Sequence, residues 1–144
     1  MAQSSTITDM MVAYAEDAVN MARVNFGATL DYSEASIETV EACLAKLYDT
    51  RPKGLFGKLF RRGPTADEIQ TAALLFGGYI GELFWRHHGG EWLLASVPGS
   101  AEPIVTLPSA GGTQIWPTAK VYKRLIHGPG DDVWAYYAVI IAKQ

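Results

Sequence analysis

The segment from Thr65 to Trp92 is apolar on almost every side when it is read as a helix. Thr65, with Glu68 three residues later, has the spacing of a capping box, in which each side chain bonds the other residue's backbone N–H. Gly89 and Gly90 stop the pattern, as glycine does just past a helix end. A helix that is hydrophobic all round belongs in the core. The sequence therefore predicts one long central helix.

Two amphipathic helices are predicted before it, over residues 5–26 and 32–48. Asp31 and Glu34 have capping-box spacing at the start of the second helix, although Ser33 is an alternative cap. The apolar faces recur at helical spacing and comprise Ile7, Met10, Met11, Tyr14, Ala18 and Met21 in the first helix and Ile37, Val40, Leu44 and Leu47 in the second.

Beyond Trp92 the apolar runs become short and are separated by Gly and Pro. Three strands are predicted, over residues 91–97, 103–107 and 113–116. Pro117 suits the first position of a short helix that runs to Ile126. Residues 131–143 favour a helix capped by Asp131 or Asp132, but their strand-forming composition keeps a strand open.

These elements predict a single α+β domain over residues 1–144. Three to four short antiparallel strands are expected to pack on the central helix, with the N-terminal helices outside. Gly77 and Gly81 lie one turn apart inside that helix. Glycine costs about 1 kcal/mol relative to alanine there, so we expect another element to approach the helix closely at this point.

Charge is unevenly distributed along the chain of 144 residues, whose net charge is −3. Residues 1–50 hold eight acidic and two basic residues, whereas residues 51–62 hold five basic and no acidic ones. With their glycines and prolines, residues 51–64 are predicted to form a basic, mobile linker between the second and third helices. The acidic balance argues against nucleic acid as a partner.

Composition also limits the classes of protein to which the chain is expected to belong. The single cysteine, Cys43, cannot form an intrachain disulfide and is interpreted as a small buried apolar residue. The N-terminus lacks the basic and apolar regions of a signal peptide, and no run approaches the roughly 20 apolar residues of a membrane span. A cytoplasmic location is expected, without a membrane partner.

No catalytic, cofactor or metal site emerges from the motifs. His87 and His88 are adjacent, so on a helix they diverge by about 100° and are poorly placed to share a metal ion. The run Gly54–Lys58 lacks the second half of a phosphate loop. A non-enzymatic protein without a cofactor is therefore expected.

Acidic residues of the second helix form the first candidate site. Glu34, Glu38 and Glu41 lie within about 60° of one another on a helix, on the side predicted to face outward, and Asp49 extends the row. A row of exposed carboxylates can steer a basic protein partner into contact. These four residues are the predicted partner-binding surface.

A pocket where the central helix meets the sheet is the alternative site. Glu82 and Arg86 have the spacing of a helical ion pair, and Trp92 and Trp116 could supply aromatic walls. This alternative describes a small-ligand-binding domain or an enzyme whose chemistry the motifs do not reveal.

The segment Gly77–Trp92, with its G-x-Y-x-G-E and G-G-x-W patterns, resembles a core found in small uncharacterised bacterial α+β domains. The run Pro117–Leu125, P-x-x-K-V-Y-K-R-L, often accompanies that core. Some small bacterial α+β proteins act as immunity partners of secreted toxins. The resemblance thus implies a protein-binding function, with direct neutralisation of a toxin as its specific form.

Overall fold

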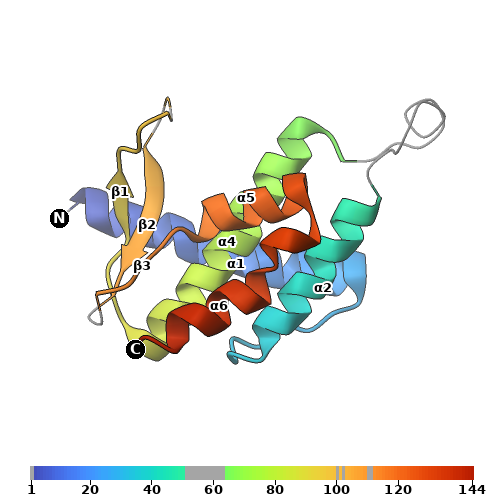
Figure 1. Ribbon diagram of the computed structural model, residues 1–144, viewed down its shortest axis with the longest axis horizontal. Coiled ribbons are helices and arrows are strands. Elements are labelled where there is room, and N and C mark those ends of the chain that lie inside the picture. The colour runs from blue at the N-terminus through green and yellow to red at the C-terminus, as the bar shows by residue number, and fades with distance from the viewer. Residues whose placement is uncertain (1, 51–63, 100, 102, 110–111) are drawn as a thin grey trace.

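The computed structural model describes residues 2–50, 64–99, 101, 103–109 and 112–144, and the side chains from Ile7 onward. Five α-helices and three strands occur within these ranges (Figure 1). In chain order they are α1 (Ala2–Phe26), α2 (Ser36–Asp49), α4 (Ala66–His88), β1 (Leu93–Ala95), β2 (Ile104–Pro108), β3 (Gln114–Ile115), α5 (Pro117–His127), the 3-10 helix η1 (Pro129–Asp131) and α6 (Val133–Ile141). The predicted linker 51–64 lies outside the described residues except for Pro64.

Helix α4 is the centre of the molecule, as its apolar pattern predicts. Its capping box forms, because Thr65 Oγ1 accepts from Glu68 N at 3.1 Å while Glu68 Oε1 accepts from Thr65 N at 2.9 Å. Every residue from Leu75 to Phe84 is buried. A helix buried on all sides has to be covered by several elements at once.

Three glycines of α4 let those elements approach. A Cβ on Gly78 would lie 2.8 Å from Tyr14 Cβ in α1, and a Cβ on Gly77 would lie 2.5 Å from Thr118 Cα in α5. Gly81 receives the ring of Trp92, whose Cη2 would lie 2.0 Å from an added Cβ. The close approach of another element is confirmed at Gly77, whereas Gly81 accommodates the side chain of Trp92, which lies just before β1.

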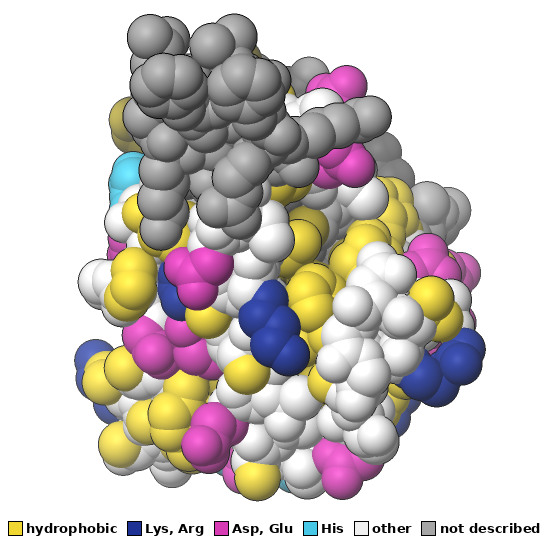
Figure 2. All heavy atoms as spheres, turned by 90° about the vertical axis from the view of Figure 1, so that its right-hand side faces the viewer, with side chains coloured by type: hydrophobic (Ala, Val, Ile, Leu, Met, Phe, Trp, Pro, Cys, Tyr) yellow, Lys and Arg dark blue, Asp and Glu magenta, His cyan; other side chains and the backbone are white. Residues whose placement is uncertain are grey.

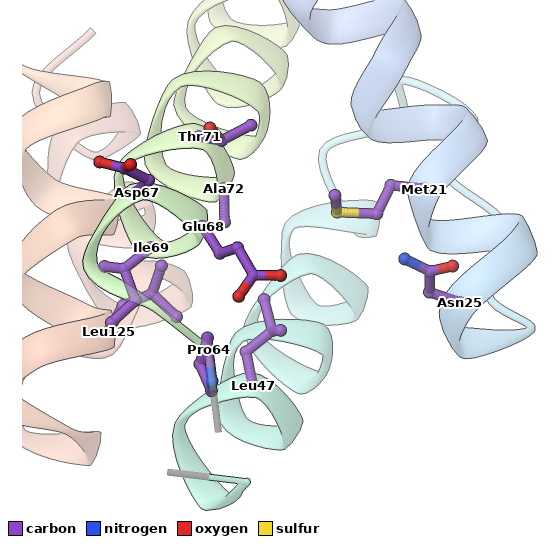
Figure 3. A pocket seen from close by; sticks show the side chains of 10 residues that line it. All are labelled: Met21, Asn25, Leu47, Pro64, Asp67, Glu68, Ile69, Thr71, Ala72 and Leu125. Carbon is purple, nitrogen blue, oxygen red and sulfur yellow. The ribbon is translucent and has the colours of Figure 1, made fainter. Parts of the chain in front are cut away.

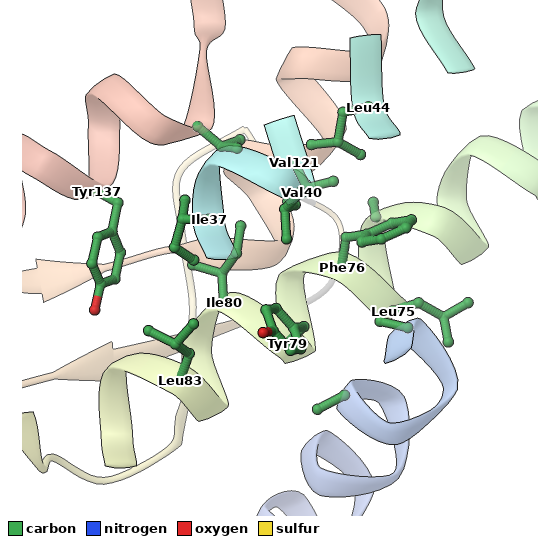
Figure 4. Packing of buried hydrophobic residues seen from close by; sticks show 14 of the residues in the cluster. Ile37, Val40, Leu44, Leu75, Phe76, Tyr79, Ile80, Leu83, Val121 and Tyr137 are labelled. Carbon is green, nitrogen blue, oxygen red and sulfur yellow. The ribbon is translucent and has the colours of Figure 1, made fainter. Parts of the chain in front are cut away.

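The core lies where α4 meets the other helices. Figure 4 shows Phe76 and Ile80 of α4 beside side chains of α2, and Leu83 on the side of Tyr137 of α6. The buried residues there include Ile37, Val40 and Leu44 of α2, Val121 of α5 and Tyr137 of α6. The core is therefore built mainly by helix–helix contacts.

The sheet has the order β1-β2-β3 and is antiparallel throughout. Leu93 pairs with Thr106, and Leu107 pairs with Ile115. It lies at one end of the molecule (Figure 1), so the expected layer of strands along the central helix does not form. A five-residue strand spans only about 17 Å, against about 35 Å for the 23 residues of α4. Helices α1 and α5 cover most of α4 instead.

The structure corrects the predicted start of α2 and settles whether the last segment is a helix or a strand. Helix α2 begins at Ser36, because Tyr32 has a positive φ of 63° and Asp31 Oδ1 accepts from Ser33 N in a local turn. The Asp31–Glu34 capping box therefore does not form. In the last segment, Asp132 Oδ1 accepts from Ala135 N and starts helix α6, so the helical alternative is confirmed there.

Within the described ranges, no helix combines the length and the apolar character that a membrane span requires.

Candidate functional site

A cleft of about 600 Å³ lies between the β1–β2 hairpin and the C-terminal helices. We call it the α5 cleft. Its apolar wall consists of Val97, Ile104 and Ala119, and Trp116 and Tyr136 add two aromatic rings. Its charged groups are Lys120, Lys123 and Asp131. The site therefore combines apolar, aromatic and ionic surfaces.

Helix α5 positions half of the cleft through its periodicity. Trp116, Ala119, Lys120 and Lys123 follow the i, i+3, i+4, i+7 spacing that places residues on one face of a helix. Pro117 occupies the first helical position, where its missing N–H costs no hydrogen bond. The opposite side of α5 packs on α4 through Thr118 and Gly77. One face of α5 thus anchors the helix and the other lines the cleft.

An ion pair spans the cleft between α5 and η1. Lys120 Nζ lies 3.1 Å from Asp131 Oδ1, and His127 Nδ1 lies 3.2 Å from Asp131 Oδ2. The hydrogen bond from Lys120 lowers the pKa of Asp131, so this carboxyl is ionised at neutral pH. Lys120 also lies 5.2 Å from the centre of the Tyr136 ring. The ammonium group is therefore held on two sides.

Tyr136 presents a neutral phenol to the site. Burial raises its pKa, which the hydrogen bond from Trp116 N offsets only in part. That bond is 3.2 Å long, and the tyrosine oxygen accepts it. The phenol's own hydrogen is then available to donate to a ligand. Together, the ammonium groups and this hydroxyl supply hydrogen-bond donors beside an aromatic wall.

The described residues do not gather three His, Cys, Asp or Glu side chains in a way that could hold a metal ion. The groups of the α5 cleft are suited instead to binding by hydrogen bonds, charge and aromatic contact.

A second cavity, of about 280 Å³, is lined by residues of α1, α2, α4 and α5 and is mostly apolar (Figure 3). Met21 and Leu47 line it from two helices, while Glu68 projects from α4. The Glu68 carboxylate already bonds Thr65 N in the capping box. The cavity also reaches Pro64, the first described residue after the gap. The α5 cleft is taken as the candidate site because it combines charges of both signs with two aromatic rings.

Two of the three glutamates of the predicted acidic surface, Glu34 and Glu41, form contacts within the fold, which corrects the expectation that all three face outward. Glu41 forms a bidentate ion pair with Arg124, with Nε–Oε2 at 2.8 Å and Nη2–Oε2 at 2.7 Å, and its Oε1 accepts from Val133 N. The Arg124 side chain is 2% exposed and that of Glu41 is 15% exposed. This carboxylate joins α2 to α5 and to the start of α6.

Glu34 has a similar internal role. Its Oε2 accepts hydrogen bonds from His88 Nε2, at 2.7 Å, and from the Tyr137 hydroxyl. Burial works to raise the pKa of Glu34, but the hydrogen bonds from Tyr137 and His88 outweigh burial and lower it. Burial raises the pKa of Tyr137, and the Glu34 carboxylate raises it further. Glu34 therefore connects the turn before α2 with the end of α4 and the middle of α6.

Glu38 and Asp49 are the two members of the predicted surface that are exposed. Figure 2 views the end of the molecule that is on the right of Figure 1. Acidic side chains there lie in several separate groups, with Lys and Arg side chains among them. A continuous row of carboxylates is not seen on that face.

The predicted pocket around Glu82, Arg86, Trp92 and Trp116 does not form as one site. Trp116 lines the α5 cleft. Glu82 is 4% exposed and pairs with Arg86 at 3.2 Å, and the Arg86 guanidinium lies 3.7 Å from the centre of the Tyr32 ring. Trp92 is buried on Gly81. Because Glu82 is four residues after Gly78, it lies on the side of α4 that faces α1, away from α5.

Four lining residues of the α5 cleft were not predicted as site residues from the sequence: Lys120, Lys123, Asp131 and Tyr136. The helical spacing of the two lysines relative to Trp116 is a sequence signal from which both could have been identified. Asp131 and Tyr136 reach the cleft only through the turn at η1, which no local pattern reveals.

Comparison of the chain with protein-family models, curated proteins and solved structures finds no match. The resemblance of Gly77–Trp92 to small bacterial domains therefore stays a prediction.

Proposed function

We propose that this protein is a small-ligand-binding domain that takes its ligand in the α5 cleft. The observation that carries the proposal is the convergence of two lysines, one aspartate and two aromatic rings on a cleft of about 600 Å³. Ligand sites in proteins have volumes of about 300–1,000 Å³ and a few polar groups in an apolar lining. The α5 cleft agrees with both criteria.

The proposal is tested by screening a small-molecule library with ligand-observed NMR against three proteins: wild type, Trp116→Ala and Trp85→Ala. Trp85 is 45% exposed on α4 and does not line the cleft, so it is the matched control. Hits should bind wild type and Trp85→Ala alike and should be lost in Trp116→Ala. Hits that survive Trp116→Ala would place binding elsewhere, and a screen without hits would contradict the proposal.

A protein-binding function, with neutralisation of a bacterial toxin as its specific form, is the second candidate. The exposed carboxylates of Glu38 and Asp49 favour it, because exposed charges raise the association rate with a basic partner. Glu34 and Glu41 are not available in the same way, since both carboxylates are engaged within the fold.

The second candidate is tested by isolating partners from the native host with wild type and with a Glu38→Lys, Asp49→Lys double variant. A specific partner that wild type retains and the double variant loses at low salt supports this function. A partner retained equally by both proteins would contradict the role of these two carboxylates.

A further inference from the structure

Resting on the proposed binding function, we infer that the ligand of the α5 cleft is a small organic anion that carries an aromatic body. The inference follows from the charge balance of the cleft, from the position of Asp131 and from the aromatic wall.

The cleft has a net positive charge. Two ammonium groups, of Lys120 and Lys123, face one carboxylate, of Asp131. Lys123 is exposed and forms no ion pair with any described residue. Residues at i and i+3 of a helix have Cβ atoms about 5–6 Å apart, so one anionic group can contact both ammonium groups. The uncapped start of α5 at Trp116 adds the positive end of a helix dipole.

The contact between Asp131 and Lys120 is an example of the contact that a bound anion would make with the same ammonium group. Its carboxylate lies 3.1 Å from the ammonium nitrogen, at a normal distance for a charged hydrogen bond. An ammonium group has three N–H donors, so Lys120 keeps donors for a second acceptor on the side of Lys123. The Lys120 side chain is 17% exposed, which limits the competition from water. Asp131 and a bound anion would share Lys120 and repel each other.

The remaining surface fits a planar apolar body. Trp116 and Tyr136 stand beside the lysines, and Val97, Ile104 and Ala119 extend the apolar wall. Aromatic rings pack on one another with centroids about 4.5–7 Å apart. A ligand with its ring against this wall presents its charged end to Lys120 and Lys123. Two lysines are too few to follow the phosphates of a nucleic acid strand, which is a further reason to infer a small anion.

The test uses three probes with the same phenylpropyl body and different charges: phenylpropionate, phenylpropanol and phenylpropylamine. Each is titrated by calorimetry into wild type, Lys123→Gln and Asp131→Asn. Wild type should bind the carboxylate most tightly. Lys123→Gln should weaken it by about two- to fivefold, the range for one partly exposed ion pair. Added salt should weaken it as well.

Asp131→Asn gives the sharpest result because the inference fixes the sign of its effect. Removing the competing carboxylate should tighten phenylpropionate by about two- to fivefold and weaken phenylpropylamine. A variant that simply folds less well would weaken both probes, so opposite changes cannot come from lost structure.

The outcomes separate this inference from the function on which it rests. Binding of the amine or the alcohol in preference to the carboxylate, or a weakening of phenylpropionate by Asp131→Asn, overturns the anion class while the cleft remains a ligand site. If none of the three probes binds and the library screen also gives no hit, the proposed function fails with it.

Discussion

At the level of single residues, three carboxylates at the start of α2 and just before it have different roles although they are close together in the sequence. Glu41 neutralises a buried arginine, Glu34 bonds a histidine and a tyrosine, and Glu38 is exposed. The partner of Glu41 is 83 residues away in sequence and that of Glu34 in α6 is 103 away. Periodicity places Glu38 and Glu41 on the helix correctly, although Glu34 lies before its first residue, and it does not reveal which groups pack against these side chains.

Replacing Glu41 by alanine should destabilise the protein by about 3–5 kcal/mol, the usual cost when one member of a buried ion pair is removed. Arg124 would remain buried without its counter-charge, and Val133 N would lose its acceptor. Chemical denaturation measures the change. Glu38→Ala, one turn earlier, is the control and should change stability by less than about 0.5 kcal/mol. Equal effects of the two substitutions would contradict the inward role of Glu41.

The Glu34 cluster should make stability depend on acid pH. The pKa of Glu34 is lowered in the folded protein from its ordinary value of 4.5. A lowered carboxyl pKa stabilises the fold above the unfolded-state pKa, and this contribution is lost as pH falls through the folded-state pKa. The difference in unfolding free energy between wild type and Glu34→Gln should therefore be largest at neutral pH and shrink below about pH 4.5. Parallel pH profiles of the two proteins would show that Glu34 is not the titrating group.

At the scale of elements, the glycines of α4 set how closely its neighbours pack. Gly81→Leu should destabilise the protein by about 3 kcal/mol, because overpacking a filled site forces side chains and backbone to move. The ring of Trp92 already fills the space beside Gly81. Gly77→Ala should also destabilise, although alanine is the better helix former, because its Cβ would meet the backbone of Thr118.

Thermal melting of these variants is compared with that of Gly130→Ala. Gly130 has no atom within 4 Å of an added Cβ and no positive φ, so its substitution should be close to neutral. A Gly81→Leu protein that melts like Gly130→Ala would mean that α4 is not enclosed at this point.

Helix α4 was predictable because its signals are local: the Thr65 capping box, the apolar residues on every side and the two glycines after His88. The three strands were located from the sequence, but their length and packing were not predicted. Both depend on which strands pair, as β1 pairs with β2, and the local sequence of one strand does not determine its partner. The α5 cleft was not predicted as a site. Trp116 was identified from the sequence, whereas Asp131 and Tyr136 join it through tertiary structure alone.

In the molecule as a whole, α5 connects the buried core with the proposed site. Its Thr118 side packs on Gly77, Arg124 is buried against Glu41, and its Lys120 side lines the cleft. A core that holds α5 on two sides fixes the backbone positions of Trp116 and the two lysines, and Asp131 also holds the Lys120 ammonium group before a ligand arrives. Such preorganisation reduces the entropy lost on binding.

The inference that the α5 cleft binds a small aromatic anion is best examined by heteronuclear NMR. Phenylpropionate is titrated into the wild-type protein while backbone and indole resonances are followed. The account predicts saturable shifts at Trp116, at Lys120 and Lys123, and at Tyr136, with little change at Trp85. Shifts confined to Met21 and Leu47 at the second cavity, or no saturable shift at any concentration that leaves the protein folded, would contradict it.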